Sequence, residues 1–172
     1  GAVAAEKALA ERLAAQLAKA ELPPRVAADL MYALAKMAQR EPFGMLTPAV
    51  CRVAADTAGF MKSRDIATVL WSAAVMELDD ARDELLSAVC PVVAAQARRG
   101  DLSAQDLAQS LWACAKLDAA GAAAAAPLAL ELAQASLGRV AEFPLHSISV
   151  SMWALGLMEN VHGEGAVRRL AE

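Results

Sequence analysis

The chain has 172 residues and a formal net charge of −4, and 58% of its residues are hydrophobic, with alanine dominant. β-branched and aromatic residues are sparse, so the composition favours helix over strand throughout. No apolar run reaches the roughly 18 to 20 residues that a membrane span needs, because charged residues or Gln interrupt every candidate. We therefore expect an all-α, soluble protein without membrane insertion.

The apolar residues recur at helical spacing along the whole chain, and Pro and Gly residues punctuate them. This pattern predicts helices over approximately residues 3–20, 24–38, 47–60, 63–77, 81–99, 103–117, 122–138 and 144–161. The alanine-rich residues 122–126 could be either helix or loop. Gly100 suits the C-terminus of the fifth helix, because glycine tolerates the left-handed conformation that ends many helices.

Four local signals bear on where these helices begin or break. Thr47, followed by Pro48, is predicted to be a hydroxyl N-cap, and Ser63 is predicted to cap the fourth helix. Ser103, with Asp106 three residues later, resembles a capping box. Pro91 lacks an amide donor, so we expect it to kink or divide the fifth helix.

Large aromatic residues mark an internal repeat. Each follows Leu or Met, and Met or Leu stands five residues after it; successive anchors are 39, 41 and 41 residues apart: Tyr32, Trp71, Trp112 and Trp153. An interval of about 40 residues is typical of stacked helical hairpins. We expect an α-solenoid with units at residues 1–41, 42–80, 81–120 and 121–161, a further unit begun in 162–172, and a longer parent protein.

A helical wheel drawn from these anchors separates a core face from an exposed strip. Positions five before, one before and five after the anchor are apolar in every unit: Ala27, Ile66, Leu107 and Ile148; Met31, Leu70, Leu111 and Met152; Met37, Met76, Leu117 and Met158. Alanine dominates positions four before and three after, which allows close helix approach. We expect the aromatic rings to fill the seams between units as core residues rather than stack on bases.

The exposed strip lies seven before, three before and four after each anchor, where the units differ. It supplies the RNA-binding candidates Arg25, Asp29, Lys36, Arg64, Thr68, Gln105, Gln109, Lys116 and His146. Hydrogen-bonding side chains that vary on a uniform scaffold are typical of proteins that read about one base per repeat. The alternative is that exposed helix positions vary because nothing constrains them. Unit four instead offers Val150 and Leu157, which are candidates for a protein contact.

The segment Ser103–Leu117 reads S-x-Q-D-L-A-x-x-L-W-A-x-A-K-L and resembles the signature of the octotricopeptide repeat family. Weaker versions lie at residues 24–37, 63–76 and 144–158, with Tyr32 in place of Trp and Val75 in place of Lys. The resemblance implies a soluble protein of a mitochondrion or chloroplast that binds organellar RNA in maturation, stability or translation. Some members are structural components of mitochondrial ribosomes, for which the partners would be rRNA and other proteins.

The sequence contains no motif for catalysis or metal binding. Cys51, Cys90 and Cys114 form no CxxC pair and are predicted to be small buried thiols, and His162 beside Glu164 is better explained by a turn. We therefore expect no enzyme activity, cofactor, metal or small-molecule substrate. Because a nucleic-acid binder is usually basic, the charge of −4 keeps open an alternative: a protein-interaction scaffold of an organellar complex, without direct RNA contact.

Overall fold

The computed structural model describes residues 2–19, 21–37, 41–76, 78 and 81–162, and this part of the chain contains helices and no strand. The α-helices are α1 (Ala2–Leu17), α2 (Pro24–Lys36), α3 (Thr47–Thr57), α4 (Ser63–Val75), α5 (Ala81–Arg99), α6 (Ala104–Ala119), α7 (Ala125–Leu137) and α8 (Leu145–His162). Short 3₁₀ turns cover η1 (Phe43–Leu46), η2 (Ala58–Phe60) and η3 (Val140–Glu142). The predicted all-α class is confirmed. None of the described helices is both long and apolar enough to cross a bilayer.

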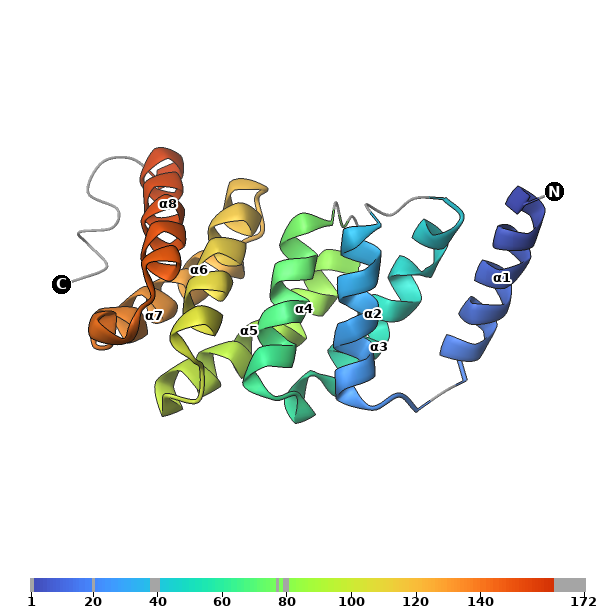
Figure 1. Cartoon of the computed structure of the whole chain (residues 1–172), viewed down its shortest axis with the longest axis horizontal. Helices are drawn as coiled ribbons and strands as arrows, with labels where there is room; N and C mark the ends of the chain where they lie inside the picture. Colours follow the sequence, from blue (N-terminus) through green and yellow to red (C-terminus); the bar gives the residue numbers. More distant parts are fainter. Residues whose placement is uncertain (1, 20, 38–40, 77, 79–80, 163–172) are drawn as a thin grey trace.

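The helices form two rows, and α1 and α8 lie at opposite ends of the molecule (Figure 1). Helices α2, α4, α6 and α8 contact one another in sequence and form the even row, which faces the viewer in Figure 1. Helices α1, α3, α5 and α7 form the odd row behind it. The rows meet where α2 packs on α3, α4 on α5 and α6 on α7. Each even-row helix therefore keeps one face turned away from the odd row.

The core lies between the rows and largely follows the predicted apolar columns. Ala27, Ile66 and Leu107, five residues before three of the anchors, are fully buried. Met37 and Ile148 are only partly buried, and Met152 departs most, because its side chain is 68% exposed. It lies on α8, which contacts the even row only through α6, so nothing in the described chain covers its other side.

Side chains also tie equivalent parts of the chain together at a regular sequence separation. The Ser63 hydroxyl donates to the carbonyl of Asp101 at 2.9 Å, across 38 residues. Arg82 donates to the carbonyl of Ala120 at 3.2 Å, also across 38 residues, and Arg139 donates to the carbonyl of Leu102 across 37. Their spacing is close to the interval between aromatic anchors, so each bond joins a helix start or loop to a loop about one repeat away.

The helix starts confirm one predicted cap and correct two. Ser103 Oγ accepts from the Asp106 amide at 3.1 Å while Asp106 Oδ2 accepts from the Ser103 amide at 3.2 Å, a complete capping box. Ser63 does not cap α4, because its hydroxyl is engaged by Asp101 and Lys62 stands at the N-cap. Thr47 does not cap α3 either: η1 runs directly into the helix, so the preceding Leu46 already has helical dihedrals.

The fifth helix is continuous, so Pro91 does not divide it. It ends at Gly100, whose φ of +74° is the left-handed conformation predicted there. Helix α7 begins at Ala125, within the alanine-rich stretch. The predicted start of a further unit after His162 lies outside the described residues.

Removal of the capping box tests how much the Ser103 side chain stabilises the start of α6. Ser103→Ala should lower the free energy of unfolding by about 1 kcal/mol, because it removes the acceptor for a helix N-terminal amide. Urea unfolding measures this change. Ser87→Ala is the matched control, since the Ser87 hydroxyl is exposed and bonds only the carbonyl of Glu84 within α5. A loss for Ser87→Ala equal to that for Ser103→Ala would contradict a capping effect.

The three cysteines are free and buried, as predicted. Burial, with a smaller contribution from Glu84, raises the pKa of Cys51 from the ordinary 9.0 to about 11. Burial also raises the pKa of Cys90 to about 11 and that of Cys114 well above its ordinary value. The thiols therefore stay protonated in the folded chain over a pH range in which the unfolded chain ionises.

This difference predicts a loss of stability at alkaline pH. The folded state holds the thiol protons more tightly than the unfolded state, so stability is retained below pH 9 and falls between about 9 and 11. Urea unfolding across this range measures the decline. A Cys51→Ala/Cys90→Ala/Cys114→Ala variant is the control for other groups that titrate there, and a decline of the same size in that variant would show that the thiols do not cause it.

Candidate nucleic-acid interface

Three depressions follow one another along the outer face of the even row, and we call them together the even-row groove. The largest, about 870 Å³, lies over the first halves of α2, α4 and α6. It shares Tyr32, Gln105 and Gln109 with a pocket of about 300 Å³, the aromatic pocket. Trp112 joins that pocket to a third depression of about 560 Å³ near the ends of α4 and α6. The groove thus runs across the whole even row.

The four aromatic anchors meet in two pairs across neighbouring even-row helices. Tyr32 and Trp71 have ring centroids 5.7 Å apart and tilted by 36°, and Trp112 and Trp153 stack at 6.0 Å. Tyr32 remains 44% exposed and Trp153 48% exposed, while Trp71 and Trp112 are partly buried. The expectation that all four rings are core residues is therefore wrong for Tyr32 and Trp153. The rings close the seams on the outer face, where no further helix of the described chain covers them.

Lys36 lies against the first of these pairs. Its Nζ is 5.5 Å from the centroid of the Tyr32 ring and 5.6 Å from that of Trp71. Such cation–π contacts contribute roughly 0.5 to 1 kcal/mol at exposed sites. They hold the ammonium group at the rim of the aromatic pocket, where an anionic ligand can reach it.

The groove carries positive charge although the chain is acidic. Six Lys or Arg side chains line it against three Asp side chains, a surplus of three positive charges: Arg25, Lys36, Lys62, Arg64, Arg82 and Lys116, with Asp29, Asp65 and Asp106. Arg25 lies 3.9 Å from Asp29, Arg82 lies 3.5 Å from Asp83, and Asp106 is engaged by the capping box. Among the described residues, no ion pair involves Lys62, Arg64 or Lys116.

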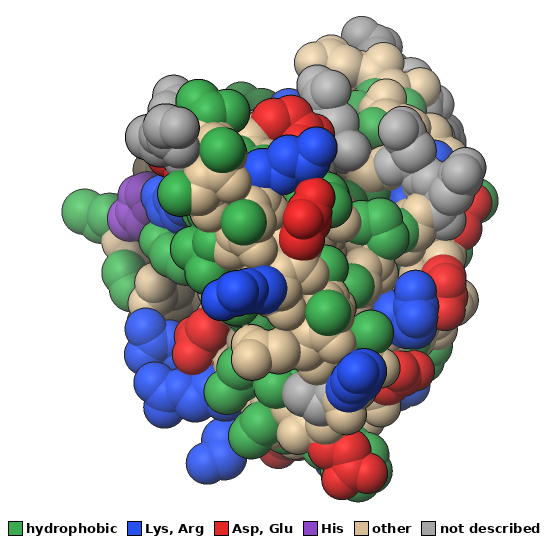
Figure 2. All heavy atoms as spheres, turned by 90° about the vertical axis from the view of Figure 1, so that its right-hand side faces the viewer, with side chains coloured by type: hydrophobic (Ala, Val, Ile, Leu, Met, Phe, Trp, Pro, Cys, Tyr) green, Lys and Arg blue, Asp and Glu red, His purple; other side chains and the backbone are tan. Residues whose placement is uncertain are grey.

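Figure 2 views the molecule from the α1 end, and its left-hand edge is the side that faces the viewer in Figure 1. Lys and Arg side chains gather along this edge, beside a His. The rest of the face mixes both charges with apolar side chains. A strand of phosphates is therefore favoured on the even-row side over the other surfaces in this view.

The structure brings nearly all predicted strip residues into this one groove. Every RNA-binding candidate lines it: Arg25, Asp29, Lys36, Arg64, Thr68, Gln105, Gln109, Lys116 and His146. Val150, predicted to contact protein, lines the aromatic pocket instead, and Leu157 is partly buried against the core. The helical wheel did not predict that Lys62 and Arg82 also line the groove. Lys62 precedes α4 and Arg82 comes from the odd row, so neither stands at a strip position.

A separate apolar hollow of about 240 Å³ lies between α7, η3 and α8. Leu137, Val140, Phe143, Met152 and Leu155 line most of it. Leu137 is 62% exposed, so the hollow continues into an apolar surface patch. Met152 is 68% exposed as well, so this patch adds exposed apolar surface near the fourth predicted unit.

In the described part of the chain, the side chains that could bind a metal ion do not gather into a metal site. No group of three or more His, Cys, Asp or Glu side chains there could hold a metal ion. Comparison of the chain with protein-family models, with curated proteins and with solved structures found no match. The site must therefore be interpreted from its own chemistry.

The contact between stacked rings can be measured by a double-mutant cycle. Trp112→Leu, Trp153→Leu and the double variant should show a coupling of about 1 kcal/mol in free energy of unfolding, because stacked aromatic pairs contribute beyond their buried area. Tyr32 with Trp153 is the control cycle, since these rings belong to different pairs and should not couple. Additive effects of Trp112 and Trp153 would contradict the stack.

Proposed function

We propose that this protein is an α-solenoid of about four stacked helical hairpins that binds single-stranded RNA along the even-row groove. The observation that carries the proposal is the groove itself, because it combines available cations, exposed aromatic rings and side-chain amides on one face. Proteins that bind single strands use the same combination: positive charge follows the backbone and aromatic rings receive bases.

The repeat architecture is supported by three regularities. The aromatic anchors recur at about 40 residues, and the three hydrogen bonds to loop carbonyls join residues 37 or 38 apart. The even-row helices contact one another in chain order, and so do the odd-row helices. In a solenoid each unit contacts only its neighbours, which matches this contact pattern.

The local charge answers the objection raised by the acidic composition. Phosphates interact with charges within about 10 Å at moderate ionic strength, so the sign of the groove matters more than the net charge of the chain. The surplus of positive charge in the groove favours RNA there, and the acidic remainder disfavours RNA elsewhere on the surface.

The biological setting rests on the resemblance to the octotricopeptide repeat family. On that basis we propose that the RNA is organellar, in a mitochondrion or chloroplast, and that the protein acts in its maturation, stability or translation. A structural place in a mitochondrial ribosome, bound to rRNA and ribosomal proteins, falls within the same proposal.

Charge removal along the groove tests RNA binding. Arg64→Ala and Lys116→Ala should each weaken binding of a labelled single-stranded RNA of mixed sequence and flatten the plot of log affinity against log salt. The slope should change by about 0.7 for each phosphate that is no longer neutralised, because fewer counterions are released on binding. Fluorescence anisotropy at several salt concentrations provides both quantities.

Arg52→Ala is the matched control, because Arg52 is exposed on α3 in the odd row. It should leave affinity and salt slope unchanged. Equal losses for Arg52→Ala and Arg64→Ala would place the phosphates outside the groove and contradict the proposed interface.

A protein-interaction scaffold is the second candidate, and the apolar hollow beside α8 favours it. This function would replace the first if Arg64→Ala and Lys116→Ala leave RNA affinity unchanged while Leu137→Asp or Met152→Asp, in the exposed lining of the hollow, releases a protein partner from the native complex. Recovery of the complex from its source organelle, followed by mass spectrometry, distinguishes these results.

A further inference from the structure

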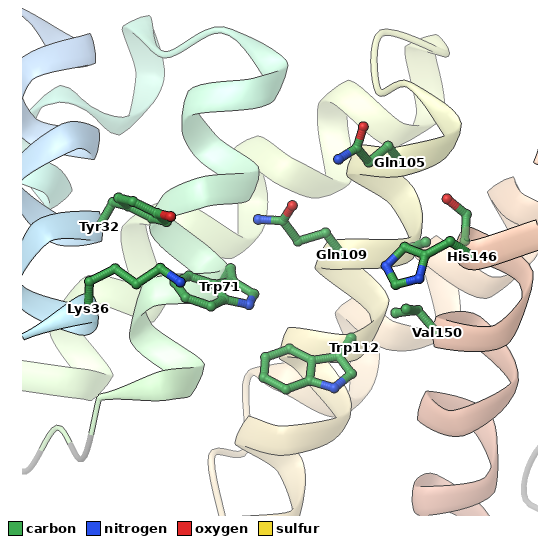
Figure 3. A pocket seen from close by; sticks show the side chains of 10 residues that line it. Tyr32, Lys36, Trp71, Gln105, Gln109, Trp112, His146 and Val150 are labelled. Carbon is green, nitrogen blue, oxygen red and sulfur yellow. The ribbon is translucent and has the colours of Figure 1, made fainter. Parts of the chain in front are cut away.

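The aromatic pocket collects side chains from all four even-row helices. Tyr32 and Lys36 come from α2, Trp71 from α4, Gln109 and Trp112 from α6, and His146 and Val150 from α8. In Figure 3, Gln109 extends from α6 into the space between Trp71 and His146, and Trp112 lies on the side of the same space below it. No single repeat could form this pocket, so it differs from a series of sites that each read one base.

The walls of the pocket suit a flat ring. The indoles of Trp71 and Trp112 and the apolar side chain of Val150 border a volume of about 300 Å³, at the lower end of small-molecule sites. Aromatic walls bind unstacked bases through their π-faces, with roughly 1 to 3 kcal/mol for each base. These walls accept any base and do not select one.

The polar side chains in the pocket provide selection. Gln105 and Gln109 each carry an amide that can donate and accept at once, and within the described part of the chain neither amide makes a hydrogen bond. Among the described residues, neither Arg nor a carboxylate lines the pocket. Arg or Lys is the usual partner of guanine, Asp and Glu accept from cytosine, and Gln pairs with adenine through two hydrogen bonds. Lys36 is the one Lys among the described lining residues, and its ammonium group is held at the rim against the Tyr32 and Trp71 rings, so the amides of Gln105 and Gln109 are left to face the base. Of these pairings, the pocket offers the one with adenine.

We propose that the aromatic pocket holds one unstacked adenine of a single-stranded RNA, an inference that rests on the proposed function. The amide of Gln109 donates to a ring nitrogen of adenine and accepts from its exocyclic amino group. Gln105 lies one helical turn earlier on α6 and is placed to contact the sugar or the adjacent base. Lys36, at the rim, contacts the phosphate of this nucleotide.

A free nucleotide carries the same adenine as an RNA strand, but the surroundings of the pocket favour the strand. The pocket opens into depressions on both sides, and these carry Arg25, Lys62 and Arg64 on one side and Arg82 and Lys116 on the other. Cations on both sides fit a chain of phosphates that passes through the pocket. A mononucleotide would leave these flanking charges unused.

Competition binding on the full chain tests the inference. Oligo(A), oligo(C), oligo(U) and an alternating G/U oligomer of equal length, together with AMP, compete against a labelled mixed-sequence RNA. We expect oligo(A) to bind about tenfold more tightly than the other oligomers, because a good bidentate pair discriminates bases by about this factor. Oligo(A) should also quench tryptophan fluorescence, and AMP should compete far more weakly than oligo(A).

Amide substitutions separate base selection from general affinity. Gln109→Leu should reduce the preference for oligo(A) to about twofold or less with the salt slope unchanged, since the substitution removes no positive charge. Gln16→Leu, exposed on α1 away from the groove, should preserve the preference. Trp112→Leu should reduce the quenching and leave that of Trp71, whereas Trp153→Leu, outside the pocket lining, should retain the quenching of both pocket indoles. Urea unfolding checks that each variant is folded.

The outcomes distinguish this inference from the proposed function. Equal binding of all four oligomers, or a preference for oligo(A) that survives Gln109→Leu in the folded variant, would overturn the adenine pocket and leave RNA binding intact. Competition by AMP as strong as that by oligo(A) would contradict the claim that the adenine belongs to an RNA strand. No binding of any oligomer would overturn both proposals.

Discussion

The close approach of neighbouring even-row helices is the constraint on which the other features depend. Ala28, Ala67 and Ala108 stand one turn before successive aromatic anchors, and each is at most 2% exposed. Since alanine ends at Cβ, adjacent backbones come close, and the larger rings one turn later meet across the seam. Bulkier residues at these positions would separate the helices, and both the ring pairs and the pocket between them would disappear.

The groove is positively charged although the whole chain is acidic, because the fold places cationic side chains together on one face. The whole chain carries −4, but helical register places Arg25, Arg64 and Lys116 on one outer face. Of the acids that share this face, Asp106 is engaged by its capping box and Asp29 lies beside Arg25. The charged residues on one face of the molecule therefore determine what binds to that face, and the net charge of the whole sequence is a poor guide to it.

Helical periodicity predicted much of this arrangement. The apolar columns predicted most of the buried positions of the first three even-row helices, and the strip predicted many of the residues that line the groove. The same wheel overestimated burial of Tyr32 and Trp153, because it describes one helix and cannot show whether another layer covers a face. It also placed Met152 in the core, although α8 has an even-row neighbour on only one described side.

Local sequence by itself determined the helices, the capping box at Ser103 and the left-handed end at Gly100, because these depend on residues within a few positions of one another. The tertiary structure decided what depends on separate units: the pairing of Tyr32 with Trp71 and of Trp112 with Trp153, the use of Ser63 to hold a neighbouring loop, and the entry of Arg82 into the groove. The aromatic pocket belongs to this second group. Its side chains come from four helices, and only the packing distances between those helices bring them around one space.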